Sequence, residues 1–398
     1  MSSDLRNLSA ETARTRMLAN LPAPVLETVT LDQALGRVLG EDIAAGHDQP
    51  PFDASAMDGW AVGGAGERFA VVGESAAGRG YPAPLAPGEA VRIFTGAPVP
   101  AGADRVVIQE VARREGEALL VPPGATGTYI RPAGGDFSKG QVLLARGQRL
   151  DPWRIALAAA AGRDRLAVAC RPRVAILATG EELAQPGQAL RPDQIYDCGG
   201  VAVAALVRSW GGEPVLLAAV GDDRAVIAAA VADVACDVLV ALGGASVGDH
   251  DLVKPALSDL GLVLAVETLA LRPGKPTWFG HLADGRRVLG LPGNPASGLV
   301  CAALFLRPLL AALEGGEPGP RLETARLAAP LPANGAREHW MRARLGSQGG
   351  VTLAQPMSDQ ESSLVSVFAQ ADALLRRPID APVAAAGDAV DILRLERL

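Results

Sequence analysis

The sequence predicts a multidomain protein of the α/β plus β class, with one doubly wound parallel sheet and several β-rich parts. Between residues 173 and 316, buried-strand runs alternate with helical runs, which is the pattern of a doubly wound α/β domain. Residues 45–145 are rich in Gly and Pro and carry short β-like runs, which indicates an irregular β-rich domain. Residues 317–398 carry short strands without helical period, which predicts a small β-barrel or a sandwich.

The elements before residue 173 follow in order. We expect a helix over 8–21, an extended run over 24–31 and a second helix over 31–43. Helical spacing returns over 151–169, which indicates a return to the element that the N-terminus began. Strands are predicted in the β-rich part at 60–64, 69–74, 90–96, 105–110 and 118–123.

The α/β part and the C-terminal part are predicted from the same kinds of pattern. Strands are expected at 173–180, 214–223, 237–242 and 286–291, and helices at 201–210, 224–235 and 295–313. Residues 314–321 have the composition of a linker. The C-terminal strand runs lie at 324–329, 340–345, 350–356, 373–378 and 389–395.

Composition excludes several classes of protein. The chain has 398 residues, of which 49% are hydrophobic and 20% charged, and its net charge of −7 argues against a basic nucleic-acid binder. We find no 18-residue apolar run and no signal-peptide core, so we expect no membrane span and a cytoplasmic location. The four cysteines lie far apart without a CxxC pair, as thiols of a reducing compartment do: Cys170, Cys198, Cys236 and Cys301.

Polar residues follow four of the predicted α/β strands, at the edge where open α/β sheets bind ligands. They are Glu181 and Glu182, Asp222 and Asp223, the loop 243–251, and the turn 292–295. Several carboxylates at one edge repel one another unless a cation joins them, which favours Mg²⁺ and a phosphate-bearing substrate. Solvated loop acids are the alternative.

The loop 243–251 carries the clearest signal for a ligand. Its glycines allow backbone amides to meet an anion, Ser246 adds a hydroxyl, and Asp249 and Asp251 suit a hard divalent cation. A turn with acidic helix caps is the alternative. The loop matches neither the P-loop pattern nor GxGxxG, so neither nucleotide fingerprint fits.

Two proline-bearing turns complete the candidate site. The turn 272–276 displays Arg272 and Lys275, and only three of the 37 basic residues in the chain are lysines. Its prolines stiffen it, and a rigid cationic turn suits an anionic ligand, with a solvated basic turn as the alternative. Asn294, between two prolines, either contacts a ligand or only caps the helix that follows.

Eight longer strings carry a resemblance to a known family. They are PPFDASAMDGWAV at 50–62, VRIFTGAPVPAGAD at 91–104, IRPAGGDFSKGQVLLARG at 130–147, ATGEEL at 178–183, LGGASVGDHD at 242–251, LRPGKP at 271–276, LPGNPASGLV at 291–300 and REHWMR at 337–342. Together they resemble the MoeA family of molybdopterin molybdenumtransferases, whose animal counterpart is the C-terminal domain of gephyrin. The matches run in order over nearly the whole chain.

The resemblance implies four domains and an elongated homodimer. The domains are a linker domain made of 1–44 and 146–172, a β-rich domain over 45–145, a molybdopterin-binding α/β domain over 173–316 and a small β-barrel over 317–398. The implied site lies between the α/β domain of one protomer and the β-rich domain of the other. In the implied reaction, adenylylated molybdopterin receives molybdate and AMP leaves with Mg²⁺ assistance. Molybdopterin adenylyltransferase and molybdoenzyme maturation proteins are implied partners, whereas nucleic acid and membranes are not.

The resemblance also implies roles for residues at matching positions. Catalytic roles fall to Asp58, Thr95, Asp136, Glu182, Asp222 and Asp251, with Asp222 and Asp251 as Mg²⁺ ligands. Substrate-binding roles fall to Gly243, Gly244, Ser246, Arg272, Lys275, Pro292, Asn294, Ser297, Arg337, Arg342 and Ser366. Within this set, molybdate is expected near Thr95, Arg337 and Arg342, and phosphate groups near the glycine loop and Lys275.

The chain departs from the family pattern at a few of these positions. Glu181 stands for an Asp, Arg272 for a Lys and Asp372 for an Asn, while Cys198 and Gly199 replace a Ser-Asn pair. The run 361–366, which includes Ser363, replaces a Ser-Gly-containing run and leaves Ser366 as the match. These departures bear on substrate contacts more than on the class of reaction.

Two other functions remain as alternatives. The first is adenylylation of molybdopterin, which a related α/β domain performs alone, and the additional strings at 50–62 and 91–104 argue against it. The second is a non-catalytic scaffold of the gephyrin kind, which predicts damage to the acidic edge, whereas the acids are present. The missing GxGxxG disfavours a dehydrogenase.

Overall fold

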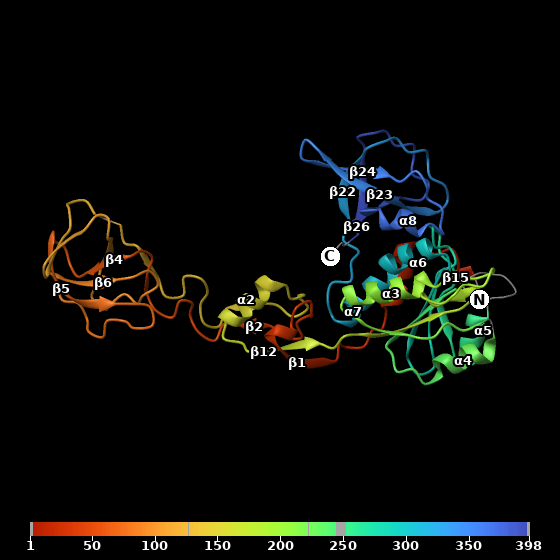
Figure 1. The fold of residues 1–398 in the computed structure, drawn as a ribbon, viewed down its shortest axis with the longest axis horizontal. Helices are drawn as coiled ribbons and strands as arrows, with labels where there is room; N and C mark the ends of the chain where they lie inside the picture. The colour runs from red at the N-terminus through yellow and green to blue at the C-terminus, as the bar shows by residue number, and fades with distance from the viewer. Residues whose placement is uncertain (1–2, 126, 222, 244–251, 396–398) are drawn as a thin grey trace. The chain divides into compact units, whose positions relative to one another are not determined.

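The computed structural model describes residues 3–125, 127–221, 223–243 and 252–395, which fall into two compact units (Figure 1). The first unit comprises residues 1–27, 36–40 and 168–398, and the second comprises residues 28–35 and 41–167. The multidomain α/β plus β class predicted from the sequence is confirmed by the sheets of these units.

The α/β part of the first unit is a six-stranded, largely parallel sheet. Its strand order is β16 (Glu213–Leu216), β13 (Arg173–Ala178), β17 (Val238–Leu242), β21 (Arg287–Leu291), β20 (Trp278–His281) and β18 (Val263–Val266). The first four strands run parallel, whereas β20 is antiparallel to both of its neighbours. The sequence analysis predicted neither β18 nor β20.

Helices cover both faces of this sheet, as the alternation along β13 requires. Val174 and Ile176 face a core shared with α1 (Ala10–Leu18), α3 (Cys198–Ser209), α6 (Pro295–Cys301) and α7 (Arg307–Leu313). Ala175 and Leu177 face a second core with α4 (Arg224–Ala232) and α5 (Val253–Ser258). Figure 1 shows α3, α6 and α7 grouped together and α4 beside α5. The doubly wound arrangement is therefore confirmed.

One helix of the first core is unusually apolar. The stretch Pro295–Leu313 has a mean hydropathy of 1.9 and is long enough to cross a membrane. The sequence analysis, which found no 18-residue apolar run, missed this stretch. It consists of α6, a π-helical segment η3 (Ala302–Leu306) and α7. Because 78% of the stretch is buried inside the structure, it packs as the central helix of a folded domain.

The C-terminal segment closes into a small barrel, which decides between the two predicted architectures. Its strand order is β19 (Leu271–Arg272), β23 (Glu338–Gln348), β24 (Val351–Pro356), β22 (Glu323–Leu327), β26 (Ala389–Arg394) and β25 (Ala373–Arg377). An additional pairing of β23 with β25 closes the sheet on itself. The strand-only prediction missed the short helix α8 (Val365–Ala369) in this segment.

The second unit is built on a separate six-stranded sheet. Its strand order is β7 (Arg105–Ile108), β4 (Gly59–Val62), β6 (Glu89–Ile93), β5 (Arg68–Ser75), β9 (Ala118–Leu120) and β8 (Arg113–Glu115). Five of these strands fall on the five predicted runs. The remaining strands form separate two-stranded sheets: β2 (Ile43–Ala44) with β11 (Val142–Leu144), β3 (Ala54–Ser55) with β10 (Ile130–Arg131), and β1 (Leu26–Thr30) with β12 (Arg165–Ala169). In the first unit, β14 (Leu183–Ala184) pairs with β15 (Ile195–Tyr196) in the same way.

The predicted helix over 31–43 is wrong. Only a single turn, η2 (Leu31–Gln33), forms there, because Gly36 takes a φ of +73° and turns the chain out of the helical path. The chain then extends, and the carbonyl of Val38 accepts a hydrogen bond of 2.9 Å from the amide of Ala169. In the predicted helical run 151–169, α2 (Pro152–Ala160) forms, but the rest becomes a turn and β12.

Candidate functional site

A pocket of about 1130 Å³ lies at the carboxyl ends of the parallel strands in the first unit. The ladders align Ala178 of β13 with Leu242 of β17, and Leu242 with Leu291 of β21. The next residues along these strands, Thr179, Gly243 and Pro292, therefore emerge side by side, and all three line the pocket. The pocket stands at the edge where ligands bind in open α/β sheets.

Glycine is required where two of these strand ends meet. Gly243 has a φ of +90°, and a Cβ atom there would lie 2.7 Å from the carbonyl oxygen of Thr179. Any residue with a side chain would be strained in this backbone conformation, and its Cβ atom would clash with the Thr179 carbonyl. Thr179 is buried at this point, and its Oγ1 has no hydrogen-bond partner among the described residues.

Three exposed cations from two different elements face the same pocket. Arg272 is the last residue of β19, Lys275 lies in the turn that follows it, and Arg337 immediately precedes β23. The parallel pairing of β19 with β23, with Arg272 opposite His339, brings the turn and Arg337 together. Three cations at one pocket provide a site for a ligand with more than one negative charge.

The cationic turn is anchored to the core beneath it. Thr277 donates a hydrogen bond of 3.1 Å from its hydroxyl to the buried sulfur of Cys301 in α6. Gly274, at a φ of +116°, packs so closely that a Cβ atom there would lie 2.3 Å from the same sulfur. The amide of Leu269 also donates to the carbonyl of Lys275, at 2.9 Å. The turn is thus held at three points, as the prolines in the sequence led us to expect of a rigid loop.

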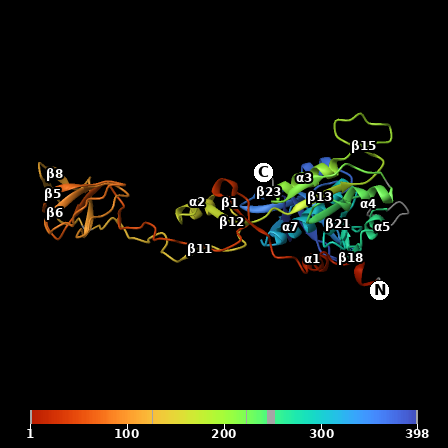
Figure 2. The same ribbon diagram turned by 90° about the horizontal axis from the view of Figure 1, so that it is seen from below.

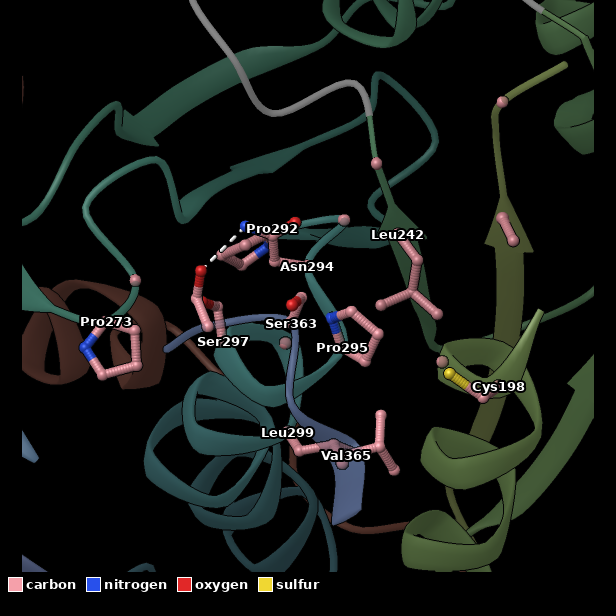
Figure 3. Close-up of a pocket in the computed structure, with 18 of the residues that line it drawn as sticks. Cys198, Leu242, Pro273, Pro292, Asn294, Pro295, Ser297, Leu299, Ser363 and Val365 are labelled. Atoms are coloured by element: carbon pink, nitrogen blue, oxygen red, sulfur yellow. Dashed lines mark hydrogen bonds between the residues drawn. The ribbon is translucent and has the colours of Figure 1, made fainter. Parts of the chain in front are cut away.

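Loop residues 360–363, which follow β24, form another wall of the pocket. Figure 3 shows Ser363 beside Pro295, and Val365 beside Leu299. The Asn294 side-chain amide donates a hydrogen bond of 2.9 Å to the hydroxyl of Ser362. Asn294 therefore does not cap α6 with its side chain, which was one of the two predictions for it.

Carboxylates also line the pocket, and each has a different environment. Asp197 is buried and accepts a hydrogen bond of 2.8 Å from the amide of Gly200 as the N-cap of α3. The pKa of Glu361 is lowered, chiefly because its carboxylate accepts hydrogen bonds from the hydroxyl and amide of Ser363. Glu182 is exposed, on the arm that carries β14 and β15 and that stands out from the sheet in Figure 2. Of the three, Glu182 is the one best suited to meet a cation.

The sequence matches three protein-family models in chain order. They are described as "MoeA N-terminal region (domain I and II)" over residues 8–162, "Probable molybdopterin binding domain" over 175–312 and "MoeA C-terminal region (domain IV)" over 324–395. The chain belongs to the MoeA family. The resemblance predicted from the sequence motifs is thereby confirmed.

Individual MoeA proteins match over almost their full length. Molybdopterin molybdenumtransferase 2 of Mycobacterium tuberculosis is 36% identical over 92% of this chain and 94% of its own. Molybdopterin molybdenumtransferase of a Nostoc species is 34% identical over 93% of this chain and 88% of its own. The crystal structure of the MoeA molybdopterin biosynthesis protein of Pyrococcus horikoshii aligns with a TM-score of 0.84 and 30% identity, covering 99% of this chain and 100% of that one.

The structure brings together about half of the MoeA site residues that the sequence singled out. Eight line the pocket: Glu182, Gly243, Arg272, Lys275, Pro292, Asn294, Ser297 and Arg337. The departures Cys198, Gly199 and Ser363 line it as well. Four candidates, including both expected Mg²⁺ ligands, lie outside the described residues: Asp222, Gly244, Ser246 and Asp251. The roles of all these residues stay predictions.

Two MoeA candidates of the barrel are not where we expected them. Arg342 is 0% exposed and lies on the face of β23 opposite to Met341 and Ala343, which pack in the barrel core; there its Nη2 donates to the carbonyls of Asp359 and Glu361 at 3.4 and 2.9 Å. Arg342 is not among the residues that line the pocket, and its expected contact with molybdate stays a prediction. Ser366 is exposed on α8 and does not line the pocket, whereas Ser363 does.

The second unit holds the other three MoeA candidates, Asp58, Thr95 and Asp136. Asp58 and Thr95 form a close pair, because one carboxylate oxygen of Asp58 accepts from both the amide and the hydroxyl of Thr95, each at 2.7 Å. These two donors, the amide first, lower the pKa of Asp58, and Arg92 adds to the effect. Asp58 is therefore ionised at neutral pH. Asp136 is exposed, and its amide donates to the carbonyl of Gln49 at 2.9 Å.

Several pocket residues were not among the predicted site residues. Thr179 and Asp197 could have been found, since each lies next to a quoted motif residue at the end of a strand or the start of a helix. Gln360 and Ser362 gave no signal, because they reach the pocket only through the closure of the barrel.

One buried histidine beside the pocket makes folding pH-dependent. Burial, together with Arg272, Arg342 and Arg337, lowers the pKa of His339 to about 4. The unfolded chain binds this proton below about pH 6.5 and the folded chain does not, so stability falls as pH decreases from 6.5 to 4. The change amounts to about 1.4 kcal/mol per pH unit and about 3 kcal/mol in all.

We expect His339→Gln to remove this part of the pH dependence. Urea unfolding of both proteins at pH 7.5 and pH 5 measures it, and the free energy of unfolding should fall less in the variant. Equal losses in the two proteins would contradict the assignment.

Proposed function

We propose that the pocket binds adenylylated molybdopterin and that the protein inserts molybdate into this substrate, with Mg²⁺-dependent release of AMP. Its family makes the protein a transferase of molybdenum cofactor biosynthesis that inserts molybdenum. The single observation that supports the finer proposal is the convergence of Arg272, Lys275 and Arg337 on the carboxyl ends of the parallel strands. An adenylylated phosphate and an oxyanion are both ligands for such a cluster.

The residues of the pocket suit different parts of this substrate. Arg272 and Lys275, on a turn that is already fixed, lose little entropy when they bind phosphate oxygens. Arg337, from the barrel side, is placed to bind a second anion such as molybdate. Thr179 and Ser297 line the pocket but are only 5% and 4% exposed, so they contribute mainly to its shape.

The donor set of the pocket also fits Mg²⁺. This ion prefers carboxylate oxygens together with water and substrate phosphates. Glu182 is an exposed carboxylate at the pocket, and Asp222 and Asp251 are the ligands expected from the sequence. When bound, Mg²⁺ neutralises charge on the phosphoanhydride and assists its cleavage.

We also propose that the protein acts as a cytoplasmic homodimer and that Asp58 and Thr95 take part in the reaction. The support for their role is chemical. A carboxylate held by two donors from a single threonine is a fixed anion, and it keeps the Thr95 hydroxyl oriented. The contribution of the second unit from a partner subunit follows the family resemblance.

The test is an assay of the purified protein with adenylylated molybdopterin, molybdate and Mg²⁺. We expect AMP and molybdenum cofactor to appear together and to depend on all three additions. Tight binding of the substrate without turnover would overturn the transferase proposal in favour of a scaffold. Consumption of ATP with molybdopterin, to make the adenylylated compound, would instead identify an adenylyltransferase.

Mixed dimers test the shared site. Asp58→Asn and Lys275→Met proteins should each have strongly reduced activity, and co-refolding them should restore part of it, since a mixed dimer then contains one intact site. Mixtures without recovered activity, although the mixed dimers form, would place both residues in the site of one protomer, whereas an Asp58→Asn protein as active as wild type would remove Asp58 from the reaction.

A further inference from the structure

The loop between β24 and α8, here called the rim loop (residues 357–363), joins the C-terminal barrel to the pocket. Four of its residues line the pocket: Gln360, Glu361, Ser362 and Ser363. A loop of this length with exposed Asp and Ser residues would ordinarily be mobile. The side chains beneath it decide whether it can serve as a wall.

Arg342 of β23 holds the rim loop from below. Its Nη2 donates to the carbonyl oxygens of Asp359 and Glu361, at 3.4 and 2.9 Å. The side chain of Gln360 accepts from the amide of Arg342 and donates to its carbonyl, each at 2.9 Å, as a neighbouring strand would. The amide of Met357 donates to the same carbonyl, also at 2.9 Å. A single residue of the barrel thus holds the rim loop from Met357 to Glu361.

The opposite side of the rim loop is bound to the start of α6. The carbonyl of Ser362 accepts from the amide of Ala296 at 3.0 Å, and its hydroxyl accepts from Asn294 at 2.9 Å. Ser297, one residue further along α6, lines the same pocket. A shift of the rim loop would therefore also displace the turn 292–295, to which the loop is hydrogen-bonded.

Stability alone does not explain a buried arginine at this position. Arg342 is 0% exposed, and its Nε and Nη1 atoms have no hydrogen-bond partner among the residues that the structure describes. A buried charge that is only partly satisfied is seldom a better stabiliser than an apolar side chain of the same volume. Its two hydrogen bonds to loop carbonyls do provide a defined loop path.

We propose that Arg342 is a positioning residue for the substrate pocket, which acts by holding the rim loop as the wall that contacts bound substrate. The proposal rests on the proposed function for one point, the identity of the substrate as adenylylated molybdopterin. Since the wall is present before and during the reaction, it contributes equally to ground-state and transition-state binding. Its loss should therefore raise KM and leave kcat nearly unchanged.

Arg342→Met is the principal variant, because it keeps the length of the side chain and removes the donors. We expect KM for adenylylated molybdopterin to rise about tenfold, the size expected for the loss of hydrogen bonds from a charged donor, and kcat to change by less than about twofold. Arg342→Lys should recover part of the affinity. Arg344→Met is the matched control, since Arg344 is exposed two residues further along β23, and it should leave both constants unchanged.

Hydrogen exchange of the full-length protein gives a readout that needs no turnover. In Arg342→Met, amide exchange should rise in residues 357–363 and at the start of α6, with the sheet amides unchanged. Gln360→Met changes no charge and is the substitute variant if Arg342→Met does not fold. It should show the same local rise in exchange. A folded Arg342→Met protein with unchanged exchange in the rim loop, or with unchanged KM, would overturn the proposal. Wild-type protein without turnover would overturn the proposed function instead, and exchange would still decide the role of Arg342.

Discussion

Lys275→Met is expected to reduce kcat/KM for adenylylated molybdopterin by about 100-fold, roughly 3 kcal/mol of transition-state stabilisation. Lys275 is exposed in the pocket, on a turn that Cys301, Thr277 and Gly274 hold in place. Charge that develops on a leaving phosphate therefore meets an ammonium group that needs no rearrangement. Steady-state kinetics with varied substrate measures the effect.

The same substitution at Lys139 is the control for Lys275→Met. Lys139 is also exposed but lies in the second unit, and its backbone amide, which donates to Asp48 at 2.7 Å, is unaffected by the change. Both variants should unfold at the wild-type temperature, because neither side chain is buried. A Lys275→Met protein with kcat/KM within threefold of wild type would remove this lysine from the substrate site.

Much of the pocket could be predicted from the sequence because its residues follow strands directly. A parallel strand that ends at Ala178 or Leu242 places the next residue at a known edge, so Gly243 and Glu182 were found from pattern alone. Arg337 was found only through the resemblance, since its approach to Arg272 depends on the pairing of β19 with β23. Local sequence carries no information about that pairing.

Two differences from the sequence-based expectation have a common physical cause. Arg342 was expected at the substrate from the family resemblance, yet its side chain is buried and its Nη2 donates to carbonyls of the rim loop. The helix expected over 31–43 has good local spacing, but Gly36 at a φ of +73° and the bond from Ala169 to Val38 give extended chain. In both cases a partner distant in sequence decided the outcome, and helical period or charge alone cannot reveal such a partner.

Gly290→Ala is expected to lower the free energy of unfolding by about 3 kcal/mol or more. Gly290 pairs with Trp278 across the antiparallel strands β21 and β20. A Cβ atom at Gly290 would lie 2.0 Å from two atoms of the Trp278 indole, and Trp278 is 0% exposed. A rigid ring enclosed by the second core cannot move aside without opening that core. The loss should appear as a lower urea midpoint, with reduced activity because β21 leads directly into the turn 292–295.

Two further variants separate this clash from the general effect of alanine in a strand. Gly346 of β23 has no atom within 4 Å of the position of a Cβ, so Gly346→Ala should be neutral or slightly stabilising. Trp278→Phe combined with Gly290→Ala should be more stable than the sum of the two single changes predicts, because the smaller ring leaves room for the methyl group. The indole nitrogen of Trp278 has no hydrogen-bond partner among the described residues, so Phe loses no hydrogen bond there. Strictly additive effects, or a Gly290→Ala protein that unfolds like wild type, would show that packing of the ring on this glycine does not stabilise the sheet beneath the pocket.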